Sequence, residues 1–467
     1  MIWMLLYNVL RIILNKVSLK IESLLRYFKN EDRSKNIQAN VIGSIILKGI
    51  SIFLSLLIVP ITINYISPYQ YGVWITISSI IGWLSFFDIG FGNGLKNKFV
   101  EAVTHGKIKL ARIYVSTTYS ILILIIFGIW FLSVILSRFV DWPKFLNVKG
   151  INNEDFFHII LIVLSTFAFQ FIFGLINTIL SALHRPVITS LINVISQFLI
   201  LVGIFVLSKL SSGSIINLSL LIGLVNTSVL LVFSLYLFLT SLNKYSPKLK
   251  YVRFKYAKGL LSLGLNFFIL QIISIIYYET NNIIITKSLS PLDVTIYNLA
   301  FKYVSIIGMF FSIILAPFWS AFIEARVLND LAWMRLETKK LYKVFTLFFF
   351  GTIVLVFCSP FAYKIWFGKS VTVPLQLTIY MGIWQIFNMW NSLHSTLIYG
   401  FGKIRLQIIA SVTVGILNIP LTIFFCMRWG LNGVVLSQII LAALISWIGP
   451  LQLSTLFNKK AYGIWNK

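Results

Sequence analysis

Apolar stretches of roughly 20 residues recur along the whole chain, separated by short polar segments. A helix of that length crosses the hydrocarbon core of a bilayer, whereas barrel strands would alternate polar and apolar residues over about ten positions. Proline stands near the ends of several stretches, where a helix must stop or bend: Pro60, Pro186, Pro291, Pro317 and Pro420. The pattern predicts an all-α integral membrane protein with twelve transmembrane helices, near residues 38–60, 71–91, 114–137, 156–181, 187–208, 215–240, 259–283, 294–318, 342–363, 373–399, 406–426 and 431–454.

The composition agrees with this pattern and excludes a soluble enzyme. The 467 residues are 58% hydrophobic and 11% charged, whereas soluble chains carry about 25% charged residues. The net charge of +26 would suit nucleic acid, anionic lipid or an anionic substrate. The positions of the charges decide among these partners. With twelve spans, 29 of the 39 Lys and Arg residues fall on one set of loops together with both termini. The positive-inside rule places that set in the cytoplasm, so the charge reflects topology and nucleic acid is not an expected partner.

The two halves of the chain resemble each other at a constant offset of 223 residues. The offset relates Ser67-Pro68 to Ser290-Pro291, Trp74 to Tyr297, and Phe99, Glu101 and Ala102 to Phe322, Glu324 and Ala325. Because six spans separate the copies, the repeat predicts two six-helix bundles related by a pseudo-two-fold axis along the membrane normal. The expected division is an arm at 1–36, an N-lobe at 37–241, a basic cytoplasmic linker at 242–258, a C-lobe at 259–456 and a cytoplasmic tail at 457–467.

The N-terminal arm has a pattern of its own. Leucine, isoleucine and valine recur at helical spacing between Leu5 and Leu25, and basic residues such as Arg11 and Lys20 fall between them. This is typical of a basic amphipathic helix lying on the cytoplasmic leaflet, so anionic membrane lipids are expected partners. A terminal tail without a role is the alternative.

Two lysines lie inside predicted spans and are not explained by topology. Lys48 shares one helical face with Ser44 and Ser51, and Lys302 shares one with Asn298. A lysine at mid-membrane costs about 2.5–3.5 kcal/mol on insertion scales, so both should face the bundle interior or a wet cavity. We expect both to bind substrate. A structural ion pair with Asp88 or Glu279 is the alternative.

Other spans carry polar or aromatic stripes that could line the same cavity. The candidates are Gln271, Tyr278 and Asn281 on the seventh span, Trp74 on the second and Asn388 on the tenth. Ammonium, amide, hydroxyl and aromatic groups together suit an anionic, sugar-bearing substrate. The carboxylates Asp88 and Glu279 are candidates for coupling or gating, with either H⁺ or Na⁺ as the coupling ion. The sequence has no nucleotide-binding loop, metal-ligand cluster or Ser/His/Asp constellation, so we expect no cofactor, no metal and no enzymatic activity.

Several motifs resemble one family in order and spacing. They are Tyr71-Gly72-Val73-Trp74, Asp88-Ile89-Gly90-Phe91-Gly92-Asn93-Gly94, Glu101-Ala102, Tyr297-Asn298-Leu299-Ala300 and Trp366-Phe367-Gly368-Lys369. The chain is similar over roughly 37–455 to polysaccharide (O-antigen type) flippases of the multidrug/oligosaccharidyl-lipid/polysaccharide exporter superfamily. One departure is Asn281, where the family often has Asp, which leaves an acidic role there in doubt.

The resemblance implies a V-shaped, MATE-like fold of two lobes in the bacterial cytoplasmic membrane. It also implies translocation of an undecaprenyl-diphosphate-linked oligosaccharide from the inner to the outer leaflet by alternating access. A polysaccharide polymerase and a chain-length regulator are the protein partners to consider.

Two other functions stay open. An ion-coupled multidrug antiporter of the same superfamily would want an acidic cavity, which two lysines disfavour. A membrane polysaccharide polymerase or ligase would usually present a large outward loop, and the longest one expected here covers only about 138–155.

Overall fold

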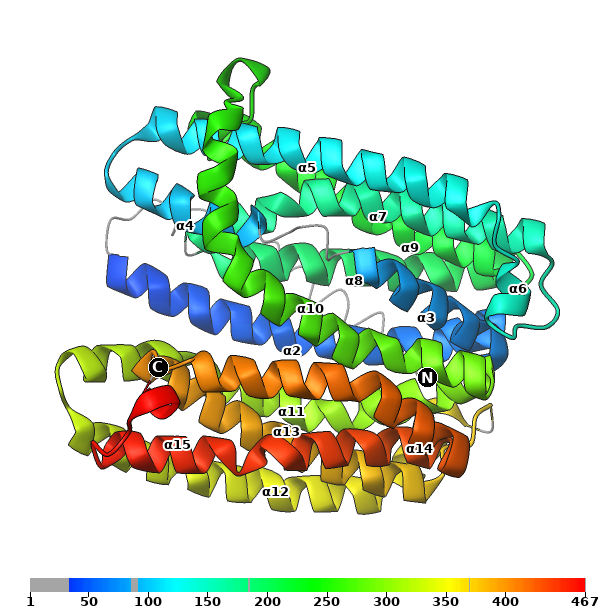
Figure 1. The fold of residues 1–467 in the computed structure, drawn as a ribbon. Helices are drawn as coiled ribbons and strands as arrows, with labels where there is room; N and C mark the ends of the chain where they lie inside the picture. Colours follow the sequence, from blue (N-terminus) through cyan, green and yellow to red (C-terminus); the bar gives the residue numbers. More distant parts are fainter. Residues whose placement is uncertain (1–32, 85–90, 184, 369, 467) are drawn as a thin grey trace.

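The computed structural model describes residues 33–84, 91–183, 185–368 and 370–466, and the regular elements in these ranges are all helices (Figure 1). The first half contains α2 (Arg33–Ile66), α3 (Pro68–Gly82), α4 (Phe91–Thr104), α5 (Ile108–Ser137), α6 (Trp142–Phe145), α7 (Asn153–Ala182), α8 (Pro186–Leu210) and α9 (Ile215–Leu239). The second half contains α10 (Ala257–Ser288), α11 (Pro291–Val327), α12 (Leu331–Phe367), α13 (Leu375–Phe401), α14 (Arg405–Ser446) and α15 (Ile448–Phe457). The expected amphipathic arm lies almost wholly outside the described residues.

Eight described helical ranges are long and apolar enough to cross a membrane. One of them, Arg405–Phe457, reverses direction at Gly430, whose φ of 57° is accessible to glycine without strain. The two arms of this hairpin touch so closely that a Cβ on Gly433 would lie 2.0 Å from the carbonyl oxygen of Phe425. This range therefore covers the last two predicted spans. The all-α membrane fold is confirmed, and the helices are consistent with twelve crossings.

Helix starts follow the predicted signals more closely than helix ends do. Pro186 and Pro291 each open a helix, where a missing N–H costs nothing. The prediction that proline marks a helix end is wrong for three others, because the helix continues past Pro60, Pro317 and Pro420. Helices in membranes tolerate internal proline because neighbouring helices satisfy the freed backbone groups.

The repeat is visible in equivalent local structure. Ser67 and Ser290 both cap helices, each hydroxyl accepting a hydrogen bond from a backbone N–H three residues later, at 3.3 Å in both cases. Phe99 and Phe322 are both fully buried, each in the core of its own half. In the C-terminal half α11 is one continuous helix; in the N-terminal half α3 ends at Gly82 and α4 begins at Phe91, and residues 85–90 lie outside the described ranges.

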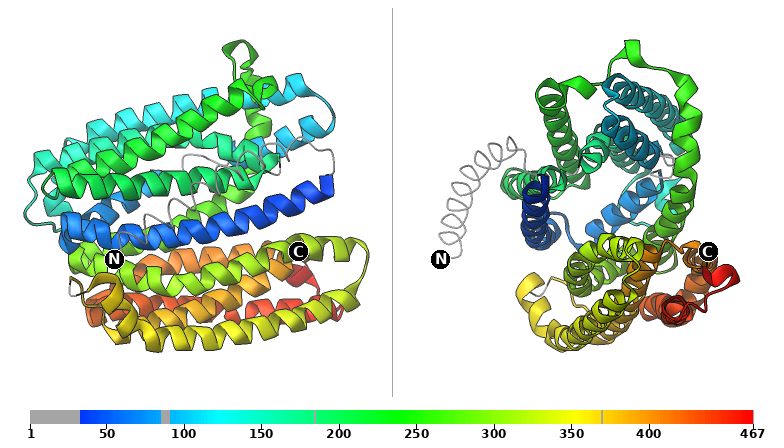
Figure 2. Two further views of the ribbon diagram at one scale, coloured as in Figure 1. Left: turned by 180° about the vertical axis from the view of Figure 1, so that it is seen from behind. Right: turned by 90° about the vertical axis from the view of Figure 1, so that its left-hand side faces the viewer.

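The helices form two bundles that lie side by side (Figures 1 and 2). In the first bundle α2 packs along α8, and α7 packs against α5 and α9. In the second, α13 lies at the centre and contacts α11, α12, α14 and α15. We call these the N-lobe and the C-lobe.

Helix α10 lies between the lobes and contacts both: it packs against α3 and α4 of the N-lobe and against α14 of the C-lobe. Its start touches α4 where Gly94 allows the approach, since a Cβ there would lie 2.0 Å from the carbonyl oxygen of Leu260. The linker before it forms three short turns, η2 (Asn243–Tyr245), η3 (Leu249–Tyr251) and η4 (Phe254–Tyr256), beside α5. We call this the linker end of the molecule, and the opposite end, which carries α6, the α6 end (Figure 1).

The lobes meet directly at the α6 end, where α3 crosses the start of α11. Thr295 donates a hydrogen bond to the carbonyl oxygen of Pro68 at 2.6 Å. At the repeat-related position Gly72 touches the carbonyl oxygen of Pro291, and a Cβ there would come within 1.7 Å of that oxygen. Two matching contacts about one pseudo-axis therefore hold the lobes together at this end.

Candidate functional site

A polar cavity of about 570 Å³ lies between the lobes, beneath the α3–α11 crossing. We call it the interlobe cavity. Its walls combine aromatic rings with amides, hydroxyls and one carboxylate: Trp74, Ile75, Ser78, Ser79, Tyr277, Glu279, Asn281, Asn282, Tyr297, Asn298, Phe301, Trp384 and Gln438. A largely preformed cavity with a few convergent polar groups is the usual form of a small-molecule site.

The asparagine side chains in this cavity form hydrogen bonds with other side chains of the protein. Asn282 donates to the hydroxyl of Ser79 at 2.9 Å, across the lobe boundary, and accepts from the amide of Asn298 at 2.8 Å. Its neighbour Asn281 faces the C-lobe, donating to the hydroxyl of Tyr297 at 3.2 Å and accepting from Gln438 at 3.3 Å. Asn282 therefore connects α10 to both lobes and Asn281 connects it to the C-lobe, and much of their hydrogen-bonding capacity is already used.

Glu279 is the one carboxylate among the described residues that line the interlobe cavity. Its side chain lies against Gly82 of α3, where an added Cβ would be 3.6 Å from the carboxyl carbon. Glu279 forms no ion pair within the described part of the chain.

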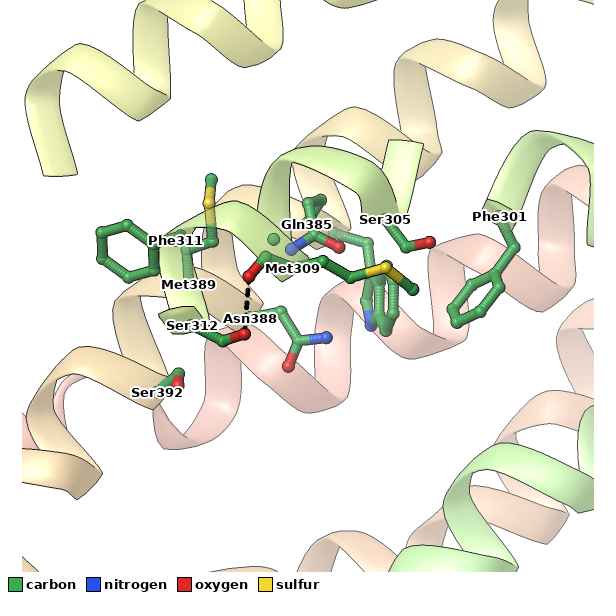
Figure 3. A pocket seen from close by; sticks show the side chains of 11 residues that line it. Phe301, Ser305, Met309, Phe311, Ser312, Gln385, Asn388, Met389 and Ser392 are labelled. Carbon is green, nitrogen blue, oxygen red and sulfur yellow. Dashed lines mark hydrogen bonds between the residues drawn. The ribbon is translucent and has the colours of Figure 1, made fainter. Parts of the chain in front are cut away.

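A second cavity of about 260 Å³ adjoins the first and lies within the C-lobe, between α11 and α13 (Figure 3). We call it the C-lobe cavity. The two cavities share the side chains of Phe301 and Trp384. The remaining lining residues are neutral: Ser305, Gly308, Met309, Phe311, Ser312, Gln385, Asn388, Met389 and Ser392.

The two lysines take different positions. Lys48 on α2 is exposed, and Lys302 on α11 is half-buried, on the helical face that also carries Asn298 and Ser305. Neither lysine forms an ion pair with Glu279, so the alternative of a structural ion pair with that carboxylate is not seen in the described residues. Asp88 lies outside the described residues. At the 223-residue offset Ser79 corresponds to Lys302, so the lysines are not related by the repeat.

The remaining predicted residues divide into three groups. Trp74, Asn281, Asn298 and Glu279 come together in the interlobe cavity, and Asn388 lies in the adjoining one. Ser44 is buried and Ser51 half-buried on α2, and neither lines these two cavities. The side chains of Gln271 and Tyr278 lie outside what the structure describes.

Sequence reasoning missed the residues that join and close the cavities. Nothing in the sequence distinguishes Trp384 and Phe301 from the other aromatic residues of the apolar spans, yet their rings, with centroids 5.6 Å apart, form the shared wall. Gln438, together with Asn418, belongs to a buried polar cluster within the α14 hairpin. The sequence signal that could have found Gln438 is an isolated amide inside an apolar span, because a polar group in the membrane needs a hydrogen-bonding partner. Within the described residues no group of His, Cys, Asp and Glu could hold a metal ion.

Comparison with known proteins gives consistent sequence matches. A protein family described as "Polysaccharide biosynthesis protein" matches residues 37–320. An O-antigen export protein of Yersinia pseudotuberculosis is 24% identical over 373 residues, covering 76% of this chain and 81% of the relative. An O-antigen transporter of Salmonella typhimurium is 22% identical over 417 residues, covering 85% and 91%.

Solved structures share the fold. An inward-facing multidrug resistance MATE family transporter of the MOP superfamily superposes with a TM-score of 0.69 at 14% identity, covering 89% of this chain and 96% of its own. The lipid II flippase MurJ, in an inward closed conformation, gives a TM-score of 0.70 at 17% identity. The superposition covers 91% of this chain and 89% of the MurJ chain. The two-lobed, MATE-like architecture is therefore confirmed.

Proposed function

Because this chain belongs to the polysaccharide biosynthesis protein family, we propose that it is a flippase for a lipid-linked oligosaccharide in the bacterial cytoplasmic membrane. The proposed substrate is an undecaprenyl-diphosphate-linked oligosaccharide, carried from the inner to the outer leaflet. The observation that carries the proposal is the polar, aromatic-rimmed interlobe cavity, beside which α11 bears Lys302. Such walls can shelter a hydrated headgroup while the lipid tail stays in the bilayer.

The direction of opening follows from where the lobes touch. The positive-inside rule assigns the basic linker end to the cytoplasm and the α6 end to the outside. The direct α3–α11 contact at the α6 end would then close the outward path. Hydrogen bonds from Asn282 to Ser79 and from Trp366 to the carbonyl oxygen of Leu56 add to this closure. Alternating access would break these bonds while each lobe keeps its own core.

The diphosphate would be attracted by the two intramembrane lysines. Lys302 and Lys48 form no ion pair with the described residues, so neither positive charge is neutralised by a carboxylate there. An ammonium group binds phosphate as a point charge, and their electrostatic attraction is stronger where water is partly excluded. The lysines would therefore hold the charged part of the headgroup.

Glu279 is the proposed coupling group, with H⁺ or Na⁺ as the ion. It lines the cavity and contacts α3 at Gly82, so a change in its charge would act at the lobe boundary. The same carboxylate favours the alternative function, an ion-coupled multidrug antiporter, which would use it to bind a cationic compound.

The test is headgroup translocation in proteoliposomes containing a lipid-linked oligosaccharide. We expect the wild-type protein to translocate it and the Lys48→Ala/Lys302→Ala double variant to lose at least about tenfold, equivalent to 1.4 kcal/mol of binding. Lys209→Ala, an exposed lysine at the end of α8, is the matched control. Full activity of the double variant would refute the role of the lysines, and transport of cationic compounds without lipid translocation would refute the flippase.

A further inference from the structure

We propose that the C-lobe cavity is a binding site for one neutral sugar ring of the substrate's glycan, separate from the place where the diphosphate binds. The inference rests on the proposed flippase function and adds a subsite that recognises hydroxyl groups. It starts from the contrast between the amides of the two cavities.

The side-chain amides of the C-lobe cavity have no hydrogen-bond partner among the described residues. Gln385 is 5% exposed and Asn388 is half-buried, and neither amide forms a hydrogen bond within the described part of the chain. Buried amides in proteins are nearly always hydrogen-bonded, so the amide of Gln385 calls for water or a ligand, and the half-buried amide of Asn388 can bind either. The asparagines of the interlobe cavity, in contrast, bond to one another and to hydroxyls.

The backbone of α11 is shaped around one of these amides. Gly308 faces Gln385, and a Cβ at that position would lie 2.1 Å from the amide nitrogen. The missing side chain therefore makes room for the amide at the cavity wall. Gln385 and Asn388 are three residues apart on α13, so both point from one helical face toward α11 (Figure 3).

The donors and acceptors match those of a sugar. Each amide offers a donor and an acceptor, which can pair with neighbouring hydroxyls of a ring. Across the cavity the hydroxyls of Ser305 and Ser312 donate to backbone carbonyls of their own helix, at 3.1 and 2.7 Å. Their oxygens can therefore still accept a hydrogen bond from a ligand hydroxyl.

The apolar wall is rigid and offers ring faces. The indole N–H of Trp384 donates to the hydroxyl of Tyr277 at 2.9 Å, which holds the ring in place. The ring of Phe301 packs against it, with the two centroids 5.6 Å apart, and completes the shared wall. An amphipathic sugar ring can lay its C–H face on such aromatics and turn its hydroxyls toward the amides.

Charge and size define the class of ligand. No charged side chain is among the residues that line this cavity, so a diphosphate here would be buried without a counter-charge. Its volume of about 260 Å³ corresponds to roughly nine water molecules, enough for one ring but not for a longer glycan. Lys302 lies one helical turn from Ser305, which lines this cavity, so a diphosphate held by that lysine would lie near the sugar site.

The experiment compares the affinity of purified protein in nanodiscs for two kinds of lipid by native mass spectrometry. One kind is bare undecaprenyl diphosphate, and the other carries one glucose, galactose or N-acetylglucosamine. We expect the wild type to bind at least one sugar-bearing lipid about 5- to 100-fold more tightly than the bare lipid, as two amide contacts would provide. The Gln385→Met/Asn388→Leu variant should lose this preference and keep its affinity for bare undecaprenyl diphosphate.

Gln376→Met is the matched control, because Gln376 is exposed on the same helix at the α6 end. If the double variant unfolds, the single variants Gln385→Glu and Asn388→Asp, which keep the side-chain shape, should reduce the preference instead. A preference that survives all these changes would overturn the sugar site, as would equal wild-type affinity for bare and sugar-bearing lipids. Both results would leave the flippase intact, whereas a wild type that binds no undecaprenyl lipid would overturn the proposed function as well.

Discussion

Replacing Gly72 by alanine should open the α6 end of the molecule. In the present conformation the new Cβ would lie 1.7 Å from the carbonyl oxygen of Pro291, whereas ordinary contacts begin at 3.4 Å. The obstacle is the backbone of a helix start, which cannot rotate away as a side chain would. Helices α3 and α11 must therefore separate by about 1.7 Å at this point.

The size of the effect follows from that displacement. The same movement would stretch the hydrogen bond from Thr295 to Pro68 from 2.6 Å to about 4.3 Å, beyond hydrogen-bonding distance. Overpacking costs about 1–3 kcal/mol and the lost hydrogen bond about 0.5–1.5 kcal/mol. Together they disfavour the closed α6 end by about 1.5–4.5 kcal/mol, a shift of roughly 10- to 2000-fold in population. Alanine also strengthens the helix by about 1 kcal/mol, but equally in both states.

The measurement is a distance distribution between spin labels placed across the α6 end. Exposed positions at Lys209 on α8 and Gln376 on α13 serve as label sites, after Cys358 and Cys426 are replaced by alanine. We expect the Gly72→Ala protein to show a longer distance in most molecules in nanodiscs.

Gly174→Ala is the control, because a Cβ at Gly174 on α7 would meet no atom within 4 Å. It adds the same methyl group to the same lobe and should leave the distance unchanged. A folded Gly72→Ala protein with the wild-type distance would refute the claim that the α3–α11 contact closes this end.

Three further predictions concern the helices around the cavity. Asn282→Leu removes the bonds to Ser79 and Asn298 and should destabilise the protein by about 1–3 kcal/mol, seen as a lower Tm; an unchanged Tm would contradict a structural network. Glu279→Gln should abolish the dependence of transport on an imposed H⁺ or Na⁺ gradient in proteoliposomes, and a retained dependence would exclude this carboxylate as the coupling group. Gly94→Ala should push α4 away from the start of α10 and speed tryptic cleavage of the exposed linker, whereas an unchanged cleavage rate would show that the contact is dispensable.

The architecture was largely predictable because it rests on local rules. Twenty-residue apolar stretches must become helices in a bilayer, since every backbone group needs an internal partner there. The serine caps at Ser67 and Ser290 and the reversal near Gly430 were marked by residue types with known conformational preferences. Proline failed as an end signal, because neighbouring helices compensate the bond it removes.

The candidate site was only partly predictable. Periodicity placed Asn281 and Asn298 on the polar faces of their helices, and in the structure both line the interlobe cavity. Periodicity could not show that the neighbouring Asn282 donates a hydrogen bond to the other lobe. It also could not show that Trp384 lies between two cavities. Those facts depend on contacts between helices far apart in sequence.

The sequence by itself determined which residues share a face of each helix, where the helices run, and which side of the membrane the charges favour. Only the tertiary structure decided which faces meet, and so which amides are used up in bonds and which are free. The physical reason is that helical periodicity acts within one element, whereas crossing geometry is set by close approaches such as those at Gly72 and Gly308. Asn282 and Asn388 are the same residue type, yet one bonds across the lobe boundary and the other lines the C-lobe cavity.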